Sequence, residues 1–137
     1  MNISLPDHAE EKISGFLYTI GQPVRVQILF IIGAREACVC HLEAALGLRQ
    51  ASISQHLMVL RKAGLVTAQR EGRNIFYHLA HPETLDILRQ AALLTGCGDE
   101  TLQALAIRPL PNCPCPHCNP GSNPDITCQN IKKARSS

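Results

Sequence analysis

The segment LRQASISQHLMVLRKAGLVTAQREGRNIFYHL, residues 48–79, decides which fold the sequence predicts. Its first half contains Ile53, Leu57 and Leu60, which recur at i, i+4 and i+7 and therefore share one face of a helix. We expect this helix over residues 50–63, because a glycine follows and polar side chains occupy the opposite face. One side of the helix then packs on a core while the other faces a partner or solvent.

The second half of the segment predicts a β-hairpin. Residues 65–69 and 74–79 are rich in β-branched and aromatic side chains, and Gly72 lies between them at the turn. Upstream, Gly47 ends a short helix that we expect over 40–47. A helix, a tight turn, a second helix and a basic hairpin together make a winged helix-turn-helix, whose second helix enters the major groove of DNA.

Further helices are expected on both sides of this segment. Apolar spacing predicts a helix over 7–20 that Asp7 caps, a buried helix over 23–33, and a last helix that starts at Pro82. The predicted fold class is mainly α with a small β-hairpin, in the order α-α-α-α-β-β-α. We expect residues 1–108 to make up this winged helix-turn-helix domain, which would bind DNA as a dimer.

The composition changes after the last helix, in which two glycines, Gly96 and Gly98, are expected breakers. The segment PLPNCPCPHCNPGSNPD, residues 109–125, is too rich in proline to form a helix. Residues 109–137 are therefore expected to be a tail that is either flexible or ordered by a metal ion.

The seven cysteines are many for 137 residues. The polar, acidic start of the chain does not resemble a secretory signal, and the longest apolar run, VQILFIIGA, is too short to span a bilayer. We therefore expect a cytoplasmic protein whose thiols stay reduced. Clustered reduced thiols indicate a metal or redox role rather than structural disulfides.

The charge is concentrated in one part of the sequence. Residues 49–73 carry five basic side chains against one acidic, and the segments on either side, 1–48 and 74–108, are both net acidic. A positive band of this kind favours contact with a polyanion such as DNA. The alternative is an ordinary solvated charged face.

Short polar side chains near the start of the 50–63 helix are candidate base and phosphate contacts, because glutamine and serine hydrogen-bond to base edges and phosphates. For any single one of them, helix capping or solvation is an equal or better explanation, and His56 lies at the edge of the apolar stripe. The predicted DNA-binding residues are Gln50, Ser52, Ser54, Gln55 and His56 on the helix, with Arg70 and Arg73 on the hairpin.

Two stretches, CVCHLEAALGLRQASISQHLMVLRKAGLV (38–66) and REGRNIFYHL (70–79), resemble the ArsR/SmtB family of small metal-responsive bacterial repressors. The resemblance implies a homodimer joined through its first and last helices. It also implies a repressor that binds a palindromic double-stranded operator and releases it when an ion binds. An enzyme is not expected, because the sequence offers no pocket-forming loops around a nucleophile and a base.

Cys38 and Cys40 lie at the expected entry to the 40–47 helix, where the first residue is not yet helical and both sulfurs can turn to one ion. Thiolates suit thiophilic ions, here arsenite, cadmium, lead or zinc. From spacing alone, two small buried cysteines are an equal alternative, and the resemblance favours ligands. In arsenic-sensing relatives a third cysteine follows, but here His41 and Glu43 occupy the later positions of that motif.

The tail offers the missing sulfurs, because residues 1–37 contain no cysteine. We expect Cys113, Cys115 and Cys118 to complete the site with Cys38 and Cys40 of the same or the partner chain. The rival is a separate structural zinc site made by the tail cysteines with Cys128. A further alternative keeps the fold but makes the thiols a redox or sulfide sensor.

Overall fold

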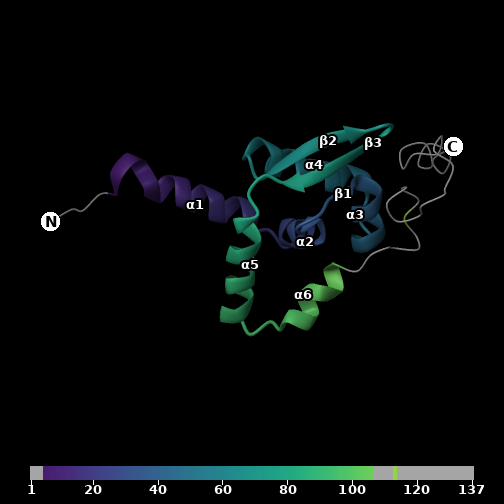
Figure 1. The fold of residues 1–137 in the computed structure, drawn as a ribbon. Helices are drawn as coiled ribbons and strands as arrows, with labels where there is room; N and C mark the ends of the chain where they lie inside the picture. The colour runs from purple at the N-terminus through teal and green to yellow at the C-terminus, as the bar shows by residue number, and fades with distance from the viewer. Residues whose placement is uncertain (1–4, 107–112, 114–137) are drawn as a thin grey trace.

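In the computed structural model, residues 5–106 and Cys113 are described (Figure 1). The chain forms a winged helix-turn-helix, as the sequence predicts. A 3₁₀ helix, η1 (Pro6–His8), is followed by α1 (Ala9–Ile20), α2 (Pro23–Ile32), β1 (Ala37–Cys38), α3 (Val39–Leu46), α4 (Gln50–Lys62), β2 (Val66–Glu71), β3 (Asn74–Leu79), α5 (Glu83–Leu94) and α6 (Asp99–Leu105).

The core is built around α2. Five consecutive residues of this helix, 28–32, are buried, which is expected for a helix that is apolar on nearly all sides. The predicted stripe of α4 is confirmed, since Ile53, Leu57 and Leu60 are all buried against the same core. Helices α3 and α4 both contact α2, so the DNA-reading unit is fixed to the centre of the molecule.

The sheet has three antiparallel strands rather than the two expected. Strands β2 and β3 form the predicted hairpin, with Gly72 at φ +60° in its turn. The additional strand β1 pairs with β3, with Ala37 opposite Tyr77 and Cys38 opposite Phe76. The strand order is therefore β1-β3-β2, and the short segment before α3 is attached to the hairpin. We call β2, β3 and their turn the wing.

One expectation at the start of the domain needs correction. Asp7 does not cap the first helix: α1 begins at Ala9, no side chain caps it, and Asp7 and His8 both adopt positive φ angles of 55° and 54°. At the other end of the domain the glycines interrupt the last helix as expected: α5 ends at Leu94, and a separate helix, α6, begins after Gly98.

Among the described residues, no single helix is long and apolar enough to cross a membrane; η1–α1 and α2 together have the length and composition, but they meet at a bend of 85°. The proposed tail from residue 109 lies outside the described residues except for Cys113. The predicted ligands Cys115 and Cys118 therefore lie outside the described residues, as does Cys128 of the alternative zinc site.

Candidate DNA-binding surface and thiol cluster

The turn between α3 and α4 sets the position of the reading helix. Gly47 adopts φ +67°, and its N–H donates a hydrogen bond of 2.8 Å to the carbonyl of Glu43. Glycine takes this left-handed conformation without a steric penalty, so α3 stops here and α4 begins three residues later. At the C-terminal end of α4, the N–H of Leu65 donates a hydrogen bond of 2.9 Å to the carbonyl of Leu60. The wing begins at the next residue, Val66.

The predicted DNA contacts on α4 are partly or fully accessible. Gln50 is its first residue, Gln55 is exposed, and Ser52, Ser54 and His56 are half-buried. On the wing, Arg70 and Arg73 are both exposed, with Arg73 in the turn beside Gly72. The start of α4 and the wing thus offer polar and cationic side chains to one partner.

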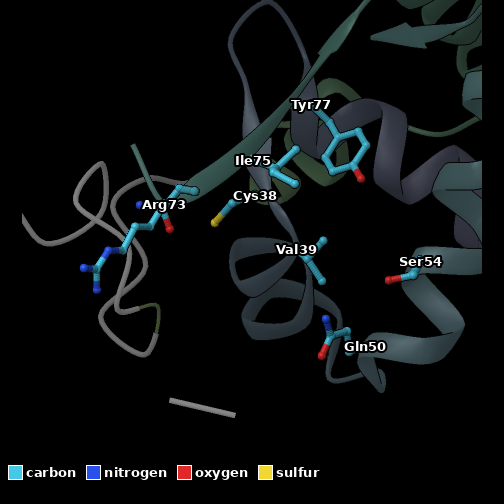
Figure 2. A pocket seen from close by; sticks show the side chains of 8 residues that line it. Cys38, Val39, Gln50, Ser54, Arg73, Ile75 and Tyr77 are labelled. Carbon is cyan, nitrogen blue, oxygen red and sulfur yellow. The ribbon is translucent and has the colours of Figure 1, made fainter. Parts of the chain in front are cut away.

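A small pocket of about 110 Å³ lies between the start of α4 and the wing. Figure 2 shows Gln50 and Ser54 of α4, Cys38 and Val39 at the start of α3, and strand β3 around it, with the Arg73 guanidinium extending away. A predicted ion ligand, Cys38, therefore lines the same pocket as three predicted DNA contacts, Gln50, Ser54 and Arg73.

His56 also has a structural interaction. Its Nδ1 accepts a hydrogen bond of 3.2 Å from Nε of Arg25, and Arg25 also donates to the carbonyl of Thr19 at 3.0 Å. Partial burial, and then the positive charge of Arg25, lower the pKa of His56 below the usual 6.5. The neutral imidazole of His56 therefore connects α4 to Arg25 of α2, and Arg25 in turn connects to the end of α1. Sequence reasoning did not identify Arg25, because this contact joins residues far apart in the chain.

Three of the predicted sulfur ligands lie in one cluster. Cys38, Cys40 and Cys113 are 2%, 7% and 0% exposed, and they pack together with Phe76 of β3. We call these four residues the thiol cluster. Cys38 has φ −89° and ψ 168°, an extended conformation at the N-cap of α3, whereas Cys40 is helical. The backbone thus changes from extended at Cys38 to helical at Cys40, as expected if both sulfurs are to face one ion.

The donor chemistry of the thiol cluster fits a thiophilic ion, because sulfur is the ligand that such ions prefer. Within residues 5–106 and Cys113, however, no three His, Cys, Asp or Glu side chains are grouped tightly enough to hold a metal ion. The sulfurs are packed in one place without converging on one point. Binding an ion through these three sulfurs alone would therefore require the sulfurs to draw closer together.

The second known site of the resembled family would fall on His81, Glu83, Leu94 and Cys97, and the sequence predicts that it is absent because Leu94 cannot ligate. Leu94 is exposed on α5, and Cys97 lies beyond the helix, where its sulfur accepts a hydrogen bond from Thr95 at 3.6 Å. These positions give no metal site among the described residues.

Comparison with known proteins agrees with this geometry. A family model described as "Bacterial regulatory protein, arsR family" matches residues 22–68, which span α2, α3, α4 and the start of β2. The "Biofilm growth-associated repressor" of Agrobacterium fabrum is 33% identical over 91 residues, 66% of this chain and 78% of that protein. The chain belongs to the ArsR family of bacterial regulatory proteins. As a member of this family of DNA-binding transcription regulators it is not an enzyme, which confirms the sequence prediction.

Two further similarities extend this result. The "Transcriptional repressor SmtB homolog" of Synechocystis is 30% identical over 82 residues, 60% of this chain, and the match spans 62% of that relative, less than two thirds of its length. The crystal structure of NolR from Sinorhizobium fredii superposes with a TM-score of 0.62 at 31% identity, covering 72% of this chain and all of that one. The winged helix-turn-helix is thus shared with solved members of the family.

Proposed function

We propose that this ArsR-family regulator is a homodimeric repressor that binds a palindromic operator and releases it when a thiophilic ion binds Cys38 and Cys40 together with cysteines of the tail. One observation carries the proposal. Cys113, the first tail cysteine, is fully buried in the same cluster as Cys38 and Cys40, although more than seventy residues separate them in the sequence. Arsenite, cadmium, lead and zinc are the candidate ions, since all accept thiolate ligands.

The DNA-binding part of the proposal rests on the reading helix and the wing. The N-terminal turns of α4 present Gln50, Ser54 and Gln55 to the major groove, and the wing arginines neutralise neighbouring phosphates. A palindromic operator follows from a two-fold symmetric dimer, because each protomer then reads one half-site about one DNA turn from the other.

The dimer is supported by apolar side chains that a single chain leaves in solvent. On α1, Ile13, Leu17 and Tyr18 are at least half exposed, and so are Leu93 and Leu94 on α5. Exposed apolar faces on two neighbouring helices are typical of a protein–protein interface. The family resemblance assigns dimerisation to the same two helices.

The thiols are placed to act on both DNA-binding elements. Cys40 is on α3, which leads through Gly47 directly into α4, and Cys38 is on β1, which pairs with wing strand β3. Drawing the three sulfurs toward one ion displaces β1 and α3, and with them the wing and the start of α4. Since the two reading helices of a dimer must match two half-sites at once, a small displacement of α4 weakens the contacts with both half-sites. A coupling of roughly 1–3 kcal/mol, typical of allosteric proteins, is enough to change operator affinity about 5- to 150-fold.

The same cluster favours a second candidate, a redox or sulfide sensor of the same fold. Buried thiols packed together are able to form a disulfide when two of them lose two protons and two electrons to an oxidant. The two candidates share the DNA-binding surface and differ only in what acts on the sulfurs.

A two-stage experiment tests the proposal. Selection from a random duplex pool with reduced protein identifies the operator, and a symmetric consensus is expected. Arsenite, cadmium, lead and zinc are then titrated under anaerobic conditions, with ion binding followed by thiolate-to-metal absorbance or by equilibrium dialysis. Stoichiometric binding of one ion that Cys38→Ser/Cys40→Ser abolishes supports the repressor. If no ion binds, but an oxidant or persulfide donor releases the DNA, the second candidate is correct.

A further inference from the structure

The chain reverses its direction after α5. The N–H of Cys97 donates to the carbonyl of Ala92 at 2.9 Å, and the N–H of Gly96 donates to that of Leu93 at 3.2 Å. With Gly96 at φ +79°, these two bonds form the Schellman motif that ends a helix and turns the chain. Helix α6 begins after Gly98 and leads back from the end of α5 toward the side of the molecule that holds α3 (Figure 1).

Helix α6 is fixed to the body of its own chain. Leu102 and Leu105 are three residues apart and so lie on the same face of the helix. Both are half-buried against the main core, where α6 contacts α2. From Ala106, the last described residue before Cys113, seven residue steps span at most about 25 Å. A docked α6 therefore keeps Cys113 close to the α2–α3 side of the same chain.

The exposed apolar faces lie on the other side of α2. Figure 1 shows α1 and α5 on one side of α2, with β1 and α3 on the opposite side. A second copy that covers Leu17 and Leu94 approaches the first of these sides, away from Cys38 and Cys40. In that copy, too, α6 leads toward the α3 of the same chain.

We propose that the sulfur site is closed within a single chain, with Cys113 joining Cys38 and Cys40 of the same protomer, and that Leu102 and Leu105 are the positioning residues that hold the tail there. This proposal rests on the proposed function, since it assumes that the thiol cluster binds an ion. Each protomer then carries a complete site, and the dimer interface contributes no ligand.

Two heterodimers separate a site within one chain from a site shared between chains. Chains with different affinity tags are coexpressed, and cadmium is added to the purified heterodimer. Native mass spectrometry counts the ions bound and verifies subunit composition. The first heterodimer pairs Cys38→Ser/Cys40→Ser with the tail variant Cys113→Ser/Cys115→Ser/Cys118→Ser. The second pairs wild type with a chain carrying all five substitutions.

The two arrangements predict opposite counts. With the site in one chain, the first heterodimer has no complete site and the second has one. With a shared site, the first has one and the second none, and that pair of results would overturn the proposal. Wild-type homodimer is the reference: if it binds none of arsenite, cadmium, lead and zinc at the cysteines, the proposed function has failed, and the heterodimer counts are not needed to show it.

The positioning role has its own test. Leu102→Ala/Leu105→Ala is expected to weaken cadmium binding at least about tenfold, because undocking α6 lowers the effective concentration of Cys113 at the cluster. The same pair in the tail variant is expected to leave cadmium affinity unchanged, since none of the three predicted tail ligands remains to be positioned. An equal loss in both backgrounds would mean that the leucines only stabilise the fold, and would refute the positioning role.

Discussion

Cys38 lies directly opposite Phe76 in the pairing of β1 with β3, and Phe76 is three residues from Arg73 at the tip of the wing. A residue proposed to bind the ion is thereby paired with the strand that leads to a proposed DNA contact. Phe76 itself packs with Cys38 in the thiol cluster. The wing, and not only the helix-turn-helix, is in position to respond to an ion.

Hydrogen exchange tests this connection. We expect one equivalent of the inducing ion to change the exchange rates of backbone amides in β1 and β3, because the β1–β3 pairing must adjust when Cys38 moves. Measurement by mass spectrometry on wild type and on Cys38→Ser/Cys40→Ser should show the change in the former alone. A change restricted to α3 and α4 would show that the wing takes no part.

The wing arginines should contribute through charge alone. Arg70→Ala and Arg73→Ala are each expected to weaken binding to every DNA sequence by a similar factor and to reduce the slope of log affinity against log salt by about 1. Fluorescence anisotropy at several salt concentrations measures both effects. Arg89→Ala is the matched control, because Arg89 is on α5, where it pairs with Asp86. A salt slope unchanged in both wing variants would exclude phosphate contacts there.

Gln50 should instead affect specificity. It is the first residue of α4, and a glutamine in that position can hydrogen-bond to the edge of one base. Gln50→Ala is expected to cost about 1–3 kcal/mol on the selected operator and to relax the preference at one base pair per half-site. Competition with operators substituted at each position provides the measurement. Uniform weakening across all of them would assign Gln50 to the DNA backbone.

The contact between Arg25 and His56 predicts a loss of stability in mild acid. The pKa of His56 is lowered, first by burial and then by Arg25, so the unfolded chain takes up the proton more readily than the folded one. The free energy of unfolding therefore falls as the pH drops below about 6.5 toward the lowered pKa. Thermal unfolding between pH 5 and 8 should show a flatter profile for His56→Gln than for wild type.

His81→Gln provides the control for that profile, because His81 is exposed outside any such contact in the described structure. Parallel profiles for wild type and His56→Gln would mean that folding does not lower the pKa of His56.

The dimer prediction concerns the exposed apolar face of α5. Leu94→Glu places a charge where a partner is expected to bury a leucine that is 88% exposed in the single chain. Sedimentation should show a shift from dimer toward monomer, and operator affinity should fall because one protomer holds only one half-site. Ala104→Glu, on the exposed side of α6, should leave both unchanged. A Leu94→Glu protein that remains dimeric would move the interface elsewhere.

The fold was predictable where the signal is local. The i, i+4, i+7 spacing of Ile53, Leu57 and Leu60 and the glycines at 47, 64 and 72 locate the reading helix and the wing to within a residue or two. Strand β1 was missed because two residues carry no periodicity, and its partners, Phe76 and Tyr77, are nearly forty residues away. Pairing at that distance depends on tertiary structure.

The candidate site divides in the same way. Spacing at a helix start made Cys38 and Cys40 candidates, and only the family resemblance favoured them as ligands over buried cysteines. The burial of Cys113 beside them belongs to the tertiary structure, in which α6 docks on α2. Asp7 illustrates the opposite error, since a good capping residue is outweighed by the turn that η1 makes before α1. Arg25 has no sequence signal of its own.

The most direct test of the account is the operator dissociation constant of reduced protein, measured by anisotropy at fixed salt with and without one equivalent of the inducing ion. The comparison uses wild type, Cys38→Ser/Cys40→Ser and the control Cys97→Ser, which removes an exposed thiol outside the cluster. The account predicts that the ion weakens operator binding about 5- to 150-fold in wild type and Cys97→Ser and has no effect on the double variant. Tight ion binding at Cys38 and Cys40 that leaves operator affinity unchanged would contradict it.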